Sequence, residues 1–171
     1  TSSGSSTYWT VQSDYTSPVG KGKFESGLRA AVRDNKNVND NAAFDYDLNK
    51  FIIIPSASSN YKYTDEVYAA YSTYSNKLGE NFSYQLGLRA ESSQYRGTLL
   101  STGETFSNKY PIEFFPSVFV TQTLSPGQDM QLNYSRRINR PNFWQQIPYY
   151  DVSDLLNIRV GNPALKPEFT N

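Results

Sequence analysis

Arg29 and Arg89 are the residues of this chain whose types and spacing are best suited to polar chemistry. Both lie in the tetrapeptide Gly-Leu-Arg-Ala, which occurs at residues 27–30 and again at residues 87–90. Each shares its parity with a nearby glutamate, Glu25 in the first segment and Glu91 in the second. Arginine and carboxylate side chains on one face form charge-assisted pairs, so we expect ion pairing there rather than acid–base catalysis.

The rest of the composition excludes most catalytic chemistry. The 171 residues include no histidine and no cysteine, which removes imidazole and thiolate metal sites and the Ser-His-Asp arrangement. Asp40, Asp45 and Asp47 lack the spacing of a calcium loop, and Val19–Lys23 lacks that of a phosphate loop. Basic and acidic residues both number 16, which gives no indication of nucleic acid. We expect no enzyme activity, cofactor, metal or nucleic-acid partner.

Alternation of apolar and polar residues predicts six β-strands. It is cleanest in Lys23–Arg33 and Phe82–Glu91. Two strands, residues 66–75 and 115–124, carry apolar side chains on both parities, so their faces stay open. The six predicted ranges are Thr7–Asp14, Lys23–Arg33, Glu66–Ser75, Phe82–Glu91, Phe115–Leu124 and Met130–Arg137.

The connections between these strands are alternately short and long. The short ones are residues 16–22, 76–81 and 125–128, and the long ones are Asp34–Asp65, Thr98–Pro111 and the chain after Asn139. Short connections are rich in turn formers, as hairpins require. Outer-membrane barrels have short periplasmic turns and longer extracellular loops. The pattern predicts an all-β fold, an antiparallel up-and-down meander from a large transmembrane β-barrel that six strands leave incomplete.

A barrel explains why both arginines interrupt apolar alternation. A lipid-facing arginine at the bilayer midplane costs about 2–4 kcal/mol, whereas one in a water-filled lumen stays solvated. A half-exposed strand of a soluble β-sandwich would place them in water as well, and it remains the alternative. The residues predicted to line the lumen, where they could contact a solute, are Arg29, Gln85, Arg89, Glu91, Asn133 and Arg137.

The most specific motif lies in the last third of the chain. Its residues are Arg137, Asn139, Arg140, Pro141, Gly161, Asn162, Pro163, Leu165, Pro167 and Glu168. The first four of these residues end an outward strand, and the other six, from Gly161 to Glu168, close the long loop that follows. This arrangement resembles the barrel of TonB-dependent receptors of the Bacteroidetes type. Leu86–Glu91 and Asp14–Pro18 also resemble elements of that family.

The resemblance implies a segment of a TonB-dependent outer-membrane transporter that takes up a scarce solute such as a chelated metal or an oligosaccharide. Barrels of that family are large, with about 22 strands and a plugged lumen. Residues 1–171 are therefore expected to be a partial barrel domain without the plug. The implied partners are lipids of the bacterial outer membrane, a TonB-type energy-transducing protein acting through the missing N-terminal part, and a surface lipoprotein.

Loop architecture explains the motif residues better than ligand contact does. Prolines lack an N–H donor and mark chain outside a sheet, and Arg140 and Glu168 are candidates for an exposed ion pair across the loop base. The apolar run Phe51–Ile54 predicts an extended loop hairpin, with a partner contact as the alternative. The aromatic residues that could stack on a solute, or pack within the loop itself, are Phe143, Trp144, Tyr149 and Tyr150.

Two other functions fit the sequence. One is a soluble, secreted β-sandwich that binds carbohydrate through the same loop aromatics. The other is a structural or adhesive barrel without transport.

Gel mobility of the full-length protein separates the membrane barrel from the soluble module. We expect a band in the outer-membrane fraction that shifts when the sample is boiled, because a closed barrel resists detergent until it is heated. A soluble band without a shift would support the β-sandwich.

Overall fold

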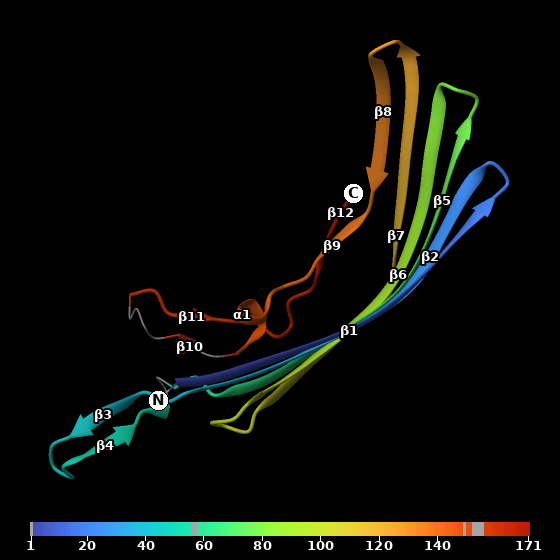
Figure 1. The fold of residues 1–171 in the computed structure, drawn as a ribbon. Helices are drawn as coiled ribbons and strands as arrows, with labels where there is room; N and C mark the ends of the chain where they lie inside the picture. The colour runs from blue at the N-terminus through green and yellow to red at the C-terminus, as the bar shows by residue number, and fades with distance from the viewer. Residues whose placement is uncertain (1, 56–57, 149, 152–155) are drawn as a thin grey trace.

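A computed structural model describes residues 2–55, 58–148, 150–151 and 156–171 of the chain. Its main element is one antiparallel sheet of six strands in the order β1-β2-β5-β6-β7-β8, which is the predicted meander (Figure 1). The strands are β1 (Ser2–Val19), β2 (Gly22–Asn39), β5 (Tyr61–Leu78), β6 (Phe82–Leu99), β7 (Thr105–Ser125) and β8 (Gln128–Ser135).

The remaining elements are short and lie in the two longest connections. The hairpin formed by β3 (Ala42–Asp45) and β4 (Lys50–Ile53) confirms the extended loop hairpin predicted from its apolar run. It projects from the end of the sheet opposite the three short turns (Figure 1). None of the described helices is long and apolar enough to cross a membrane. The other short elements are β9 (Arg137–Asn139), α1 (Phe143–Gln146), β10 (Tyr150–Asp151), β11 (Arg159–Val160) and β12 (Glu168–Thr170).

The three short turns depend on glycine. Gly20, Gly79 and Gly127 have φ angles of 62°, 70° and 80°, in the left-handed region where a Cβ atom is unfavourable. Gly127 follows Pro126, the residue that presets the first central position of such a turn. These glycines allow each hairpin to reverse within two or three residues. Short turns were predicted at all three places, although the strands extend further into them than predicted.

Two of the predicted long loops are mostly strand, so that part of the prediction was wrong. β2 continues to Asn39 and β5 begins at Tyr61, while β6 continues to Leu99 and β7 begins at Thr105. These extra residues are polar enough to look like loops. They stay paired because the ladder of backbone hydrogen bonds continues and because one of their faces is buried, as described below.

The register determines which face every side chain occupies. Leu28 is opposite Ala70, and Leu88 is opposite Ser72 and Pro116, so these residues share the convex outer face. Residues directly opposite on the other face include the pair Tyr71 and Arg89. The open question for β5 is thereby settled. Tyr68, Ala70 and Tyr74 point outward, whereas Val67, Ala69 and Tyr71 point inward with the arginines.

The outer face carries a band without charge. Every outward residue from Phe24 to Val32 in β2 and from Phe82 to Ser92 in β6 is uncharged. The length of each uncharged stretch matches the roughly 9–11 residues that a tilted strand needs to cross a bilayer. Leu28, 64% exposed, and Leu132, 70% exposed, have no protein cover in this band, as expected for side chains that contact lipid. The face identifies a segment of a transmembrane barrel wall.

Pro116 explains why β8 leaves the sheet early. The backbone N–H of Arg136 donates to the carbonyl of Pro116 at 3.1 Å, so the N–H that Pro116 lacks would have pointed at the same strand. β8 ends one residue earlier, where Ser135 is opposite Ser117. Beyond that point the chain pairs as β9 with β12 instead. The predicted strand Met130–Arg137 is thus divided between two sheets.

Replacing Leu88 by arginine tests the assignment of the faces. We expect Leu88→Arg to destabilise the barrel by about 2–4 kcal/mol, because the charge enters the lipid-facing band near its centre. The measurement is the urea midpoint of the heat-modifiable band of the full-length protein in lipid vesicles. Gln85→Arg, on the opposite face of the same strand, is the control and should shift the midpoint little; equal losses would contradict the assignment.

Candidate functional site

The loop between β9 and β12 folds back onto the inner face of the sheet. We call residues 33–39, 61–67, 93–99 and 105–111 the strand extensions, because they continue the sheet beyond the uncharged band. Phe143 from α1 contacts their inner face, with ring centroids 4.5 Å from Tyr61 and 4.7 Å from Tyr63. The buried cluster at this contact consists of Tyr61, Tyr63, Tyr95, Leu99, Phe106, Tyr110 and Ile147.

Tyrosine hydroxyl groups fasten the loop to the sheet. Tyr95 donates to the carbonyl of Pro163 at 2.5 Å, and Tyr110 donates to that of Leu165 at 3.1 Å. Burial raises the pKa of Tyr110 to about 12. Burial, followed by the charge of Asp65, also raises the pKa of Tyr63. These hydroxyls therefore stay protonated at physiological pH and remain able to donate.

The loop is also ordered by its own polar contacts. α1 is a single turn that begins with a capping box, in which the side chains of Asn142 and Gln145 each accept from the other residue's backbone N–H. Gln146 is almost fully buried and donates to the carbonyl of Pro141 at 2.8 Å. The backbone of Asn162 donates to the carbonyl of Gln145 at 2.7 Å. This hydrogen bond ties the segment around α1 to the segment around Asn162.

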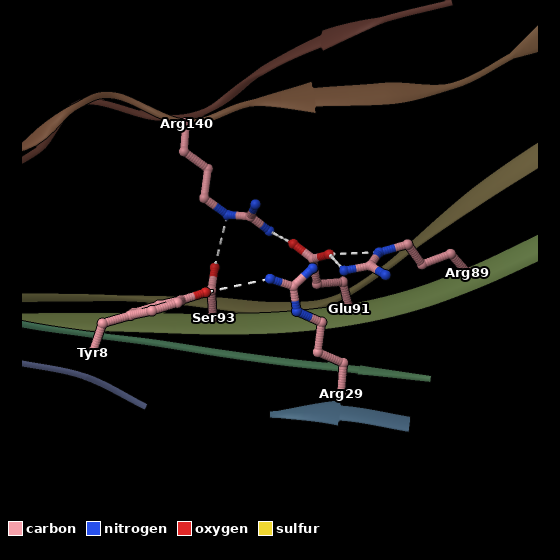
Figure 2. A network of polar contacts seen from close by, with 6 residues as sticks. All are labelled: Tyr8, Arg29, Arg89, Glu91, Ser93 and Arg140. Carbon is pink, nitrogen blue, oxygen red and sulfur yellow. Dashed lines mark hydrogen bonds and ion pairs between the residues drawn. The ribbon is translucent and has the colours of Figure 1, made fainter. Parts of the chain in front are cut away.

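A cluster of charges lies where this loop meets the barrel wall (Figure 2). The Glu91 side chain is only 5% exposed and has an arginine on each oxygen. Arg89 pairs with one oxygen at 2.5 Å from the same strand, and Arg140 pairs with the other from the loop. Arg140 also donates to the hydroxyl of Ser93 at 3.0 Å. A buried carboxylate needs such partners because an unpaired charge there is costly.

Two further arginines beside this cluster form no ion pair with a described carboxylate. Arg29 donates to the Tyr8 hydroxyl at 3.3 Å, and Arg33 lies 5.2 Å from the centre of the Tyr8 ring. Among the residues that the structure describes, neither has a carboxylate within 4.0 Å. They line a cavity of about 190 Å³. Its charged residues are Arg29, Arg33, Asp65, Arg89, Glu91 and Arg140.

Four arginines against two carboxylates make this cavity positive by two charges. Burial raises the pKa of the Asp65 carboxyl group, while the charges of Arg33 and Arg140 lower it. Guanidinium groups bind carboxylates and phosphates in bidentate fashion. The cavity is therefore suited to an anionic group, and the described residues include no group of three or more His, Cys, Asp or Glu side chains that could hold a metal ion.

The predicted lumen residues divide into three groups. Arg29, Arg89 and Glu91 come together in the charged cluster. Gln85 and Asn133 lie on the same face, on either side of Phe119 and nearer the short turns. Arg137 belongs to β9, opposite Thr170, with an exposed side chain outside the six-stranded sheet.

The loop residues chosen from the sequence have different positions. Phe143 is packed in the aromatic cluster. Trp144 lies in α1 and Tyr150 begins β10, while Tyr149 lies outside the described residues. Whether any of them contacts a solute stays a prediction.

The residues of the loop motif stabilise the fold of the loop itself. Asn162 accepts from the backbone N–H of Ala164, and Pro163 accepts the Tyr95 hydroxyl. Gly161, Pro141 and Pro167 fall within the same folded segment. The proposed pair between Arg140 and Glu168 was wrong, because Arg140 pairs with Glu91 while Glu168 accepts from Asn139 at 3.5 Å. A buried carboxylate attracts the guanidinium more strongly than an exposed one does.

Several residues of the site were missed from the sequence. Tyr8, Arg33, Asp65 and Ser93 join the charged cluster from four strands. Their parity matches that of Arg29 and Arg89 once the register is known. Two tyrosines of the buried cluster had a visible signal in the alternating Tyr61-Lys62-Tyr63, which belongs to a strand rather than to a loop.

The fold and the uncharged outer band define a segment of a membrane β-barrel. The sequence matches the outer membrane protein beta-barrel family over residues 1–171, and the chain belongs to that family. It is therefore a protein of the bacterial outer membrane, and the soluble β-sandwich alternative is wrong. A search of curated proteins found no match.

Removing the Arg140 charge should loosen the loop. We expect Arg140→Gln to raise the rate of tryptic cleavage after Arg159 roughly tenfold or more, because a hydrogen bond to a charged group contributes about 1.5–3 kcal/mol and cleavage requires local opening. Limited proteolysis of the full-length protein in detergent measures this rate. Arg137→Gln, in β9 three residues before Arg140 and outside the cluster, should cleave at the wild-type rate. Equal rates in the two variants would contradict the role of Arg140.

Proposed function

We propose that this chain forms part of the wall and extracellular loops of a TonB-dependent outer-membrane transporter that takes up a scarce solute with an anionic group. The observation that carries the proposal is the cavity on the inner face, where four arginines meet two carboxylates and where Arg29 and Arg33 have no described carboxylate within 4.0 Å. This excess of guanidinium groups favours an anion that arrives from outside. The motif from Arg137 to Glu168 supports the same family.

The proposal assigns binding rather than gating or catalysis to this chain. The loop fastened by Arg140 and the tyrosines would narrow the lumen above the cavity and limit access to it. In this scheme a plug domain closes the lumen. A TonB-type partner displaces the plug with energy supplied from the inner membrane. A surface lipoprotein would deliver the solute at the outer end, where the β3–β4 hairpin exposes Phe51 and Ile53.

Energised uptake tests the function. We expect cells that produce the full-length protein to import radiolabelled ferric citrate, an anionic chelate, at a rate that a protonophore abolishes. Arg29→Gln/Arg33→Gln should lower that rate roughly tenfold or more, because each lost charge-assisted contact is worth about 1.5–3 kcal/mol. Neutral maltotetraose measured in parallel should depend little on the two arginines.

The control is Lys21→Gln/Lys77→Gln, which removes the same charge near the short turns and should leave uptake unchanged. A correctly inserted barrel that imports neither compound would favour the structural or adhesive alternative. Energised uptake of maltotetraose alone would support the transport function but would show that the solute is a sugar rather than an anion.

A further inference from the structure

The outward face of the strand extensions carries four exposed cations above the uncharged band. They are Lys36 in β2, Lys62 in β5, Arg96 in β6 and Lys109 in β7. Lys36, Lys62 and Arg96 have the parity of the lipid-facing Leu28, Ala70 and Leu88. Lys109 faces the same way because the register shift between Glu91 and Ser93 places it opposite Gln94. They therefore point away from the lumen and its arginine cluster. These four residues are called the basic stripe below.

The stripe is continuous across four neighbouring strands. Lys36 is directly opposite Lys62. Arg96 is opposite Thr64, which makes it the diagonal neighbour of Lys62, and Lys109 is opposite Gln94, which makes it the diagonal neighbour of Arg96. Directly opposite side chains have Cβ atoms about 5 Å apart and diagonal ones about 7–8 Å apart. Like charges in such positions repel, so an isolated protein gains nothing from this arrangement.

The members of the stripe also lie at one level of the membrane. Lys36 lies 16 residues from Gly20, Lys62 and Arg96 each lie 17 from Gly79, and Lys109 lies 18 from Gly127, the glycine of each hairpin's turn. A strand tilted by about 40° rises about 2.5 Å per residue along the membrane normal. The stripe therefore lies about 40–45 Å above the turns. That is the thickness of a bilayer with its headgroups.

Local carboxylates neutralise the stripe only in part, through the pair of Arg96 with Glu66. Glu66 accepts from Tyr68, from Gln94 at 2.6 Å and from Arg96 at 3.4 Å. Asp34 accepts from Thr64 at 2.6 Å. Within the described chain, Lys36, Lys62 and Lys109 have no carboxylate within 4.0 Å. Four cations against two engaged carboxylates leave this part of the outer face positive.

An apolar depression lies on the same face, nearer the short turns than the stripe. It has a volume of about 550 Å³. Ala30, Ala70 and Ala90 form its floor and the larger Leu28, Tyr68 and Ile112 surround them. Small side chains between large ones leave room for an acyl chain that packs along the strands. The outer face therefore offers a slot for a lipid tail and, on its extracellular side, a surface for its charged head.

We propose that this face binds a phosphorylated lipid of the outer leaflet, with the phosphate groups on the basic stripe and an acyl chain in the alanine-floored depression. Charge complementarity and the headgroup level of the stripe identify a lipid rather than a soluble anion as the occupant. The bound phosphates would relieve the repulsion between Lys36 and Lys62. The proposal depends on the outer-membrane location and is independent of any transported solute.

Lipid titration of the full-length protein in nonionic detergent tests it. The probes are a fluorescent, diphosphorylated glucosamine-disaccharide lipid and the same lipid without phosphates, followed by anisotropy. We expect the phosphorylated lipid to bind at least tenfold more tightly. Lys36→Gln/Lys62→Gln/Arg96→Gln should weaken its binding on the order of 100-fold, since each cation near a membrane surface contributes about a factor of five.

The control is Lys21→Gln/Lys50→Gln/Lys77→Gln, which removes three exposed cations outside the stripe and should bind as the wild type does. Heat-modifiable mobility checks that each variant is folded, and Lys36→Gln/Lys62→Gln replaces the triple variant if that one does not fold. Equal affinity for the two lipids, or equal losses in stripe and control variants, would overturn the proposal. Competition by millimolar inorganic phosphate would also overturn it, because the site would then recognise a soluble anion.

Discussion

The structure depends on one constraint, which is that a strand in lipid can place charge on only one of its faces. The hydrocarbon supplies no water for side chains or backbone, so the sheet must pair its own peptide groups and keep its outer face apolar. Charged side chains within the membrane are thereby confined to the inner face. Arg29, Arg89 and Glu91 meet there because the alternation leaves them no other position.

Beyond the membrane the same alternation continues, but there the outer face is exposed to water and the inner face is buried. Along β5, Ala70 faces lipid and Tyr71 faces the lumen, whereas Lys62 is exposed outside and Tyr63 is buried inside. The buried face exists only because the loop carrying Phe143 covers it. A strand of period two can therefore serve two environments without a change in register, which also places the basic stripe directly above the apolar band.

Local sequence was sufficient for features that depend on neighbouring residues alone. The six strands, the turns at Gly20, Gly79 and Gly127 and the hairpin at Phe51 were predictable because alternation and turn chemistry act over a few residues. The ends of the strands were not predictable. The segment from Thr98 to Pro111 is polar, and its pairing depends on a distant loop that buries one face.

The sequence by itself determined strands with one polar and one apolar face, joined by tight turns at one end, because period and turn spacing are local properties. Only the tertiary structure decided which arginine meets which carboxylate. Arg140 lies 49 residues from Glu91, and its preference for that side chain over Glu168 follows from burial. Likewise only the register shows that Lys36 faces Lys62. Such pairings are set by distances between separate strands, which no local pattern encodes.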